Sequence, residues 1–119
     1  VTGFTTAVTA VVSIFDIPPD VFLFLPKVSG TSNSDTIVFA AIPTEFRPVA
    51  AFVRTLAVIV DNGGPMQTGM AFLDGGTSSS SGVLTIYATI NQGLFTAAGT
   101  KSVEGMMIGY SRLALSAGT

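Results

Sequence analysis

Short apolar segments alternate along the whole chain with clusters of Gly, Pro, Asp, Asn and Ser. Such clusters favour turns, and short apolar segments between turns are typical of β-strands. The alternation is clearest in Val83–Ile90, where Leu84 and Ile86 would face one side and Thr85 and Tyr87 the other. We predict strands at Thr9–Phe15, Val21–Leu25, Thr36–Ile42, Phe52–Val60, Gly69–Leu73, Val83–Ile90 and Glu104–Leu115, with a further short strand within Gly3–Ala7.

Turn-forming segments recur at regular intervals between these strands. Ser29–Asp35 and Gly99–Glu104 are two of them, because both consist mainly of small polar residues and Gly. Short strands separated by Gly- and Pro-rich turns predict one all-β domain over residues 1–119. The expected architecture is an antiparallel β-sandwich of the jelly-roll type, with about seven or eight strands.

Two of the predicted strands are apolar on both faces. Val21–Leu25 is apolar at every position, and Phe52–Val60 carries Leu56 and Val58 on one face with Arg54, while its other face is also mostly apolar. In a sandwich, one face of each sheet forms the core and the other normally meets water. A strand that is apolar on both faces therefore needs a second partner, and an adjacent protomer could supply it.

Charged residues are scarce and make up 10% of the 119 residues, whereas soluble domains carry about 25%. A folded chain of this size exposes roughly 6,000 Å², so large parts of that surface would lack the interspersed charge that keeps monomers soluble. This favours an obligate oligomer in which neighbouring copies cover part of the surface. The alternative is a monomer that depends on neutral Ser and Thr side chains for solubility.

The chain has neither Cys nor His, which excludes disulfides, thiolate zinc sites and Ser-His or Cys-His catalysis. Its five basic residues are scattered, so we expect no nucleic-acid partner. No apolar run reaches the about 18 residues of a membrane-spanning helix, and we expect no membrane insertion. Carboxylate pairs such as Asp16/Asp20 and Asp74/Glu104 could serve glycoside hydrolysis, but seven acids spread over the loops make chance pairs easy to find. We predict no catalytic residue, no metal ion and no cofactor.

The segment Ile42–Pro48 is the most distinctive local motif. Pro43 and Pro48 fix φ at both ends and remove two backbone donors. Between them, Phe46 can fill the end of the core and Arg47 can reach a nearby carbonyl or carboxylate. We predict a rigid corner that carries the chain between the sheets, with Phe46 and Arg47 in structural rather than receptor-contacting roles.

Five short motifs follow one another along Thr36–Leu115 and together resemble the C-terminal head domains of bacteriophage tail-fibre and receptor-binding proteins. The motifs are Ile42-Pro43-Thr44-Glu45-Phe46-Arg47-Pro48, Asp74-Gly75, Leu84-Thr85-Ile86-Tyr87, Phe95-Thr96-Ala97-Ala98-Gly99-Thr100 and Met107-Ile108-Gly109-Tyr110.

The resemblance implies a homotrimeric β-sandwich at the tip of a virion tail fibre, outside the cell, that binds a polysaccharide or protein on the host surface. It also implies that residues 1–119 are the C-terminal part of a longer fibre protein. Three other functions stay open. A structural virion component, such as a fibre connector or capsid decoration domain, would not bind host cells. A cellular trimeric ligand of the tumour-necrosis or complement-globular type and a glycan-cleaving enzyme are the others.

The loops provide the candidate receptor-binding residues. If a fibre shaft joins at Val1, an up-and-down order of strands places alternate loops at opposite ends. The loops away from the shaft would be Asp16–Asp20, Pro43–Pro48 and Asp74–Gly82, and those near it Pro26–Asp35, Asp61–Thr68 and Asn91–Lys101. The longest distal loop is rich in hydroxyl groups that suit sugar recognition, so the predicted receptor-binding residues are Asp74, Thr77, Ser78, Ser79 and Ser80. The next candidates are the amides Asn62, Gln67, Asn91 and Gln92.

Overall fold

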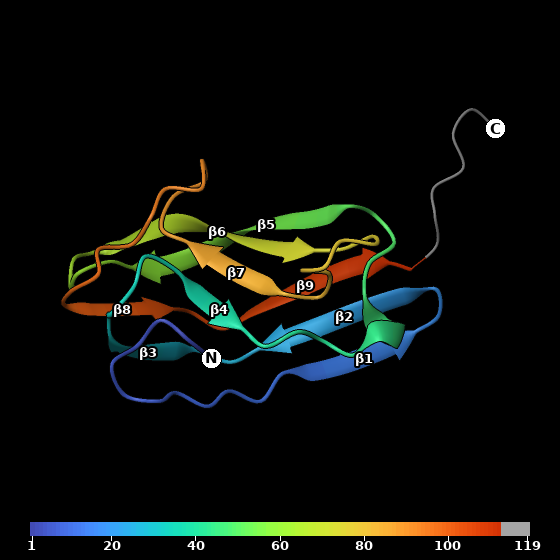
Figure 1. The fold of residues 1–119 in the computed structure, drawn as a ribbon, viewed down its shortest axis with the longest axis horizontal. Coiled ribbons are helices and arrows are strands. Elements are labelled where there is room, and N and C mark those ends of the chain that lie inside the picture. The colour runs from blue at the N-terminus through green and yellow to red at the C-terminus, as the bar shows by residue number, and fades with distance from the viewer. Residues whose placement is uncertain (113–119) are drawn as a thin grey trace.

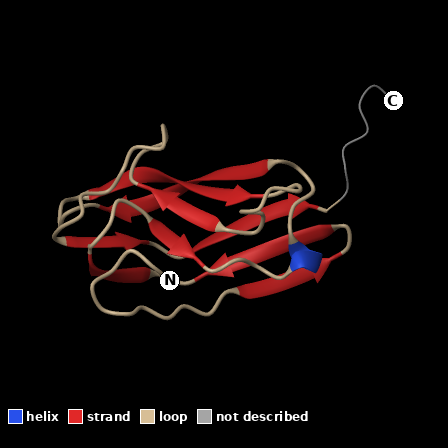
Figure 2. Ribbon diagram, in the orientation of Figure 1, coloured by secondary structure: helices blue, strands red, loops and turns tan. Residues whose placement is uncertain are grey.

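The computed structural model describes residues 1–112, which form nine β-strands and one short 3₁₀-helix, η1 (Thr44–Phe46). The strands make two antiparallel sheets packed against each other (Figures 1 and 2). The predicted all-β antiparallel sandwich is confirmed, with nine strands in place of the expected seven or eight. The three-stranded sheet has the order β1 (Ser13–Ile17), β2 (Asp20–Leu25), β9 (Met106–Ser111). The six-stranded sheet has the order β3 (Val28–Thr31), β8 (Thr100–Val103), β5 (Phe52–Val60), β6 (Met66–Asp74), β7 (Leu84–Tyr87), β4 (Ile37–Phe39).

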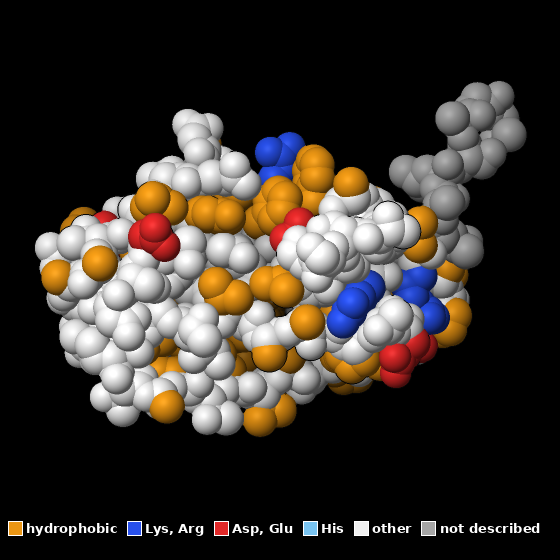
Figure 3. Space-filling view, in the orientation of Figure 1, with side chains coloured by type: hydrophobic (Ala, Val, Ile, Leu, Met, Phe, Trp, Pro, Cys, Tyr) orange, Lys and Arg blue, Asp and Glu red, His pale blue; other side chains and the backbone are white. Residues whose placement is uncertain are grey.

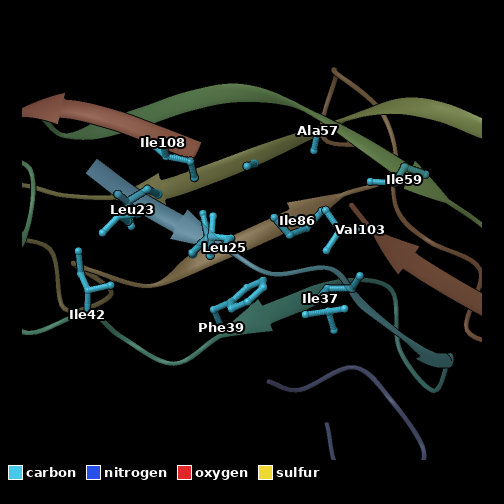
Figure 4. Packing of buried hydrophobic residues seen from close by; sticks show 14 of the residues in the cluster. Leu23, Leu25, Ile37, Phe39, Ile42, Ala57, Ile59, Ile86, Val103 and Ile108 are labelled. Atoms are coloured by element: carbon cyan, nitrogen blue, oxygen red, sulfur yellow. The ribbon is translucent and has the colours of Figure 1, made fainter. Parts of the chain in front are cut away.

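The hydrophobic core lies between the two sheets (Figure 4). Leu23 and Ile108 come from the three-stranded sheet, and Leu84 and Ile86 come from β7 opposite them. The alternation predicted for β7 is confirmed, since Leu84 and Ile86 are buried and Tyr87 on the other face is half-buried. Each buried aliphatic side chain of this kind contributes about 1.5–3 kcal/mol to the free energy of unfolding.

Two strands, β3 and β8, lie in segments that the sequence predicts as turns. They pair with each other, with Val28 opposite Val103, and β8 also joins β5. Their sequences, VSGT and TKSV, show no apolar alternation that would reveal a strand. The turn predictions for Ser29–Asp35 and Gly99–Glu104 are therefore wrong where the two segments enter the sheet.

The other predicted strands are present with shifted ends. β5 has the predicted bounds, whereas β6 is longer than predicted because it pairs with β5 along its whole length, from Val60 opposite Met66 to Phe52 opposite Asp74. β1 begins at Ser13 rather than Thr9 and ends at Ile17, while β4 and β7 are shorter than predicted.

The two termini of the described chain differ most from the predicted strands. Within Gly3–Ala7 there is only an isolated bridge, between Phe4 and Ser32. The predicted last strand, Glu104–Leu115, begins at Met106 and continues to Ser111, and its final residues lie outside the described part of the chain.

The strand order corrects the up-and-down topology. Strands β5, β6 and β7 are consecutive neighbours, and β4, which precedes them in sequence, lies beside β7. This is a Greek-key arrangement. The corner Pro43–Pro48 consequently connects two strands of the same six-stranded sheet, β4 and β5, and the expectation that it joins the two sheets is wrong.

Candidate binding site at the corner end

Three loops meet at one end of the sandwich, which we call the corner end: Asp16–Asp20, the corner Pro43–Pro48 and the hydroxyl loop Asp74–Gly82. The guanidinium of Arg112 bonds both Asp16 Oδ1, at 2.7 Å, and the carbonyl of Glu45, at 3.1 Å. The amide of Gly76 donates to the carbonyl of Pro48 at 3.1 Å. These contacts tie the three loops together, which confirms their predicted grouping.

The other loops meet at the opposite end, which we call the Lys101 end. The amide of Thr96 donates to Asp61 Oδ1 at 2.9 Å, and the hydroxyl of Ser32 donates to the carbonyl of Thr96 at 2.6 Å. The predicted grouping of loops therefore survives the Greek-key connection. Val1 lies near the middle of the long axis (Figure 1), so its position does not rank the two ends by distance from a shaft.

An open pocket of about 480 Å³ separates the corner from the hydroxyl loop. We call it the Arg47 pocket, and it is lined by Thr44, Arg47, Pro48, Val49, Gly76, Thr77, Ser78 and Ser81. Of the predicted receptor-binding residues, Thr77 and Ser78 line this pocket, whereas Asp74, Ser79 and Ser80 do not. Arg47 and Ser81 also line the pocket but are not among the predicted receptor-binding residues. The corner and the hydroxyl loop are neighbours only in the folded chain, so their contact could not be predicted from the sequence.

Hydrogen bonds hold the hydroxyl loop in a defined shape. The amide of Gly82 donates to the carbonyl of Asp74 at 2.8 Å, which closes the loop at its base. The hydroxyl of Ser81 donates to the carbonyl of Gly76 at 3.2 Å. Gly76 has a φ of 63°, a left-handed conformation that glycine adopts without strain. Thr77 and its neighbours at the tip are exposed, so the loop presents hydroxyl groups on an ordered base.

Arg47 is held along the floor between the corner and the loop. Its Nε donates to the carbonyl of Ile42 at 2.8 Å, which confirms that this side chain reaches a carbonyl. A Cβ added to Gly82 would lie 2.5 Å from Nε of Arg47, so only a glycine at this position allows the arginine side chain to approach so closely. Among residues 1–112 the ion pairs are Lys27–Glu104 and Arg112–Asp16, and Arg47 has no carboxylate partner there.

Strand β9 contacts the corner through Tyr110. The hydroxyl of Tyr110 donates to the carbonyl of Phe46, and burial raises the pKa of Tyr110 to about 12. Phe46 itself is half-buried and packs against the core, while Pro48 is fully buried. Phe46 therefore fills the end of the core as predicted, and the corner forms a rigid wall for the pocket.

Lys101 has an unusual buried position at the opposite end. Its ammonium donates to the carbonyls of Ser34 and Thr36 at 2.9 and 2.8 Å. It also lies 5.2 and 5.4 Å from the ring centroids of Phe4 and Phe95. Burial lowers the pKa of Lys101, opposed by the nearby carboxylates Asp35 and Asp61. Lys101 therefore connects segments that are distant in the sequence, and its ammonium donates hydrogen bonds to backbone carbonyls of the protein itself.

The four alternative amide candidates lie away from the Arg47 pocket, and some have structural roles. Gln67 donates to the carbonyl of Ala88 at 2.9 Å. Asn62 and Gln92 have φ values of 51° and 61°, which suits the tight turns that they occupy. Asn91 is exposed. These residues therefore do not join the hydroxyl loop in a common surface.

The outer faces of both sheets expose large apolar side chains. On the six-stranded sheet, Phe52 and Phe72 stack with centroids 5.3 Å apart, and Leu56 is 67% exposed. We define the β5–β6 face as Phe52, Leu56, Val58, Met66 and Phe72. Exposed hydrophobic side chains follow these strands along the upper edge of Figure 3. On the three-stranded sheet, the exposed apolar residues are Phe15, Ile17, Phe24 and Met107.

Within residues 1–112 there is no group of three or more His, Cys, Asp or Glu side chains arranged to hold a metal ion. The same part of the chain contains no helix long and apolar enough to cross a membrane. In comparisons with known proteins, no family model matches the sequence and no curated protein matches it significantly.

Proposed function

We propose that the protein is the head domain of a bacteriophage-type tail fibre. In this proposal it acts as a homotrimer and attaches the virion to a polysaccharide or protein on the host cell. The order of the five motifs along Thr36–Leu115 suggests this role. The observation that carries the proposal is the β5–β6 face, because a trimeric head needs such an apolar surface and an isolated sandwich would leave it in water.

The large exposed fractions of the apolar side chains on the β5–β6 face support assembly into a trimer. Leu56, Met66 and Val58 are 67%, 64% and 46% exposed, and they follow one another along two paired strands. Contiguous exposed apolar patches of this kind mark interaction surfaces. Burial of one such side chain stabilises an interface by about 1.5–3 kcal/mol, so three copies of the face would contribute substantially.

A second copy of the same chain is the occupant that best fits this face. The chain carries only twelve charged residues, the sum of five basic and seven acidic ones. Charged residues lie at one end of the β5–β6 face: Asp74 is opposite Phe52, and the guanidinium of Arg54 lies 4.8 Å from the ring centroid of Phe52. The stretch in which residues 56–60 of β5 pair with residues 66–70 of β6 contains no charged residue. We therefore place this stretch at the threefold axis.

The corner end provides the surface for host attachment in this proposal. Its three loops are tied together by hydrogen bonds, and the Arg47 pocket opens between two of them. Sugar sites combine hydroxyl or charged donors with a flat apolar wall, and the pocket offers Thr77 and Ser78 opposite Pro48 and Val49.

Binding of the fluorescently labelled protein to intact bacteria tests this function. We expect saturable binding to cells of a susceptible species and loss of binding after their surface polysaccharide or protein has been stripped. A trimer that binds no cell across a broad panel of bacteria would instead indicate the structural virion component. Release of reducing ends from purified surface polysaccharides would indicate the glycan-cleaving enzyme.

A further inference from the structure

The Arg47 pocket combines a guanidinium that has no carboxylate partner within residues 1–112 with several hydroxyl groups. Nε of Arg47 is used by the carbonyl of Ile42, whereas no residue in 1–112 accepts a hydrogen bond from its Nη1 or Nη2. Thr44, Thr77 and Ser78 line the same pocket. An arginine that is fixed at Nε and open at its Nη atoms is suited to bind the two oxygens of an oxyanion.

The other basic residues of the described chain are already engaged. Arg112 pairs with Asp16 at 2.7 Å, and Lys27 pairs with Glu104 at 3.2 Å. Lys101 is buried. Arg54 stacks on an aromatic ring of the β5–β6 face. Arg47 is thus the basic residue at the corner end whose charge has no carboxylate partner within residues 1–112, and it lies in the wall of the pocket.

We propose that the Arg47 pocket binds an anionic sugar unit, through a carboxylate or a phosphate that contacts Nη1 and Nη2 of Arg47. This inference rests on the proposed host-attachment function and specifies the chemical class of the receptor. The pocket volume of about 480 Å³ is within the range for small-molecule sites, about 300–1,000 Å³. The hydroxyls of Thr77 and Ser78 can bond the sugar hydroxyls, while Pro48 and Val49 face its apolar side.

The structure also explains why this arginine would bind well despite being a surface residue. The hydrogen bond to Ile42 and the contact with Gly82 restrict the guanidinium before any ligand arrives. Ordering a long flexible side chain on binding normally reduces affinity, so a side chain that is already ordered avoids part of that loss. In this proposal Arg47 has a ligand-binding role in addition to its structural role, which departs from the sequence-based expectation that it does not contact the receptor.

Titration of the purified protein with small anionic probes, followed by NMR chemical shifts, tests the inference. The probes are glucuronic acid for a carboxylate source and glycerol 1-phosphate for a phosphate source, with glucose and glycerol as neutral controls. We expect saturable shifts of the Thr77 and Ser78 amides with at least one anionic probe and much weaker shifts with its neutral control. The probe that binds more tightly identifies the anion. Equal responses to charged and neutral probes, or no saturable shift with either anion, would overturn the inference.

Two substitutions locate the binding group. Arg47→Gln can keep a donor for the Ile42 carbonyl but removes the charge, and we expect it to weaken probe binding by at least about tenfold. Arg54→Gln is the matched control on the β5–β6 face and is expected to leave binding unchanged. Because Arg47→Gln could unfold the corner, Ser78→Asp supplies a second test, since a negative charge at the exposed pocket wall repels an anion. Its control is Ser29→Asp, an exposed position on β3 that lies outside the pocket lining.

Cell binding separates this inference from the function on which it rests. If the protein binds cells, but neither probe competes and Arg47→Gln binds normally, the anionic-sugar inference fails and the attachment function stands. If the protein binds a probe through Arg47 but no cells, the attachment function fails and the pocket assignment stands.

Discussion

At the residue scale, sequence and structure agree where a side chain acts locally. Arg47 reaches a carbonyl five residues earlier, at Ile42, and Phe46 packs against the nearby end of the core. Lys101 could not be predicted, because lysine is almost never fully buried. Its partners Ser34 and Thr36 are 67 and 65 residues away in sequence. The residues around Lys101 in the sequence therefore do not indicate that its partners are backbone carbonyls in the connection between β3 and β4.

Phe46→Ala should destabilise the protein without removing its binding surface. Phe46 is half-buried rather than fully buried, so we expect a loss of about 2 kcal/mol, below the about 3–5 kcal/mol of a fully buried phenylalanine. Urea denaturation measures this loss, and binding to cells should persist at temperatures where the variant is folded. Unchanged stability together with lost cell binding would show that Phe46 contacts the receptor.

Tyr110→Phe should change the response of stability to alkaline pH. The folded pKa of Tyr110 is raised to about 12 from 10.0, so the folded protein retains a proton that the unfolded chain loses above about pH 10. The stabilisation by this group is therefore present below pH 10 and is lost as the pH rises to about 12. We expect the variant to be less stable by about 1 kcal/mol at neutral pH, because the Phe46 carbonyl loses its donor. Denaturation of both proteins at pH 7 and at pH 11 measures this. The difference in stability between the unmodified protein and the variant should be smaller at pH 11 than at pH 7, whereas an equal difference at both pH values would contradict this account.

At the element scale, strands with an apolar pattern could be predicted and strands without one could not. β5 has the predicted bounds, and β7 shows the predicted alternation. β3 and β8 contain small polar residues and are held by their pairing with each other and with β5. The hydroxyl loop could be predicted as a loop, but its contact with Pro48 depends on the Greek-key connection. The hydroxyl loop of the candidate site could therefore be predicted from the sequence, whereas its position beside the corner could not.

Replacing Thr77–Ser80 by Asn-Gly tests the role of the hydroxyl loop. This change keeps Gly76 and Ser81, which bond each other and the corner. We expect the free energy of unfolding to change by less than about 1 kcal/mol, because shortening a surface loop has a small effect on loop-closure entropy. Binding to cells should fall. If a folded variant binds cells normally, the receptor surface lies elsewhere, and the amides Asn62 and Asn91 at the Lys101 end become the candidates.

At the scale of the whole molecule, the two-sided apolar strands have a direct structural counterpart. Their inner residues form the core, and their outer residues remain exposed on both sheets. The proposal of a trimer rests on the apolar side chains of these outer faces. Its central part is the assignment of the β5–β6 face to the threefold axis.

Leu56→Asp should dissociate the trimer. Three aspartates would approach one another at the axis and lose their hydration without gaining a cationic partner, which is strongly unfavourable. Ser79→Asp adds the same charge on the exposed hydroxyl loop and should leave the assembly intact. Size-exclusion chromatography compares the two variants. Dissociation by Phe24→Asp but not by Leu56→Asp would place the interface on the three-stranded sheet and contradict the assignment.

Sedimentation equilibrium of the unmodified chain at micromolar concentration tests the central claim most directly. The account predicts a single species with three times the 12.2 kDa mass of one chain, stable on dilution within the micromolar range. A species of 12.2 kDa under the same conditions would contradict it, because the β5–β6 face would then remain exposed to water in the native protein.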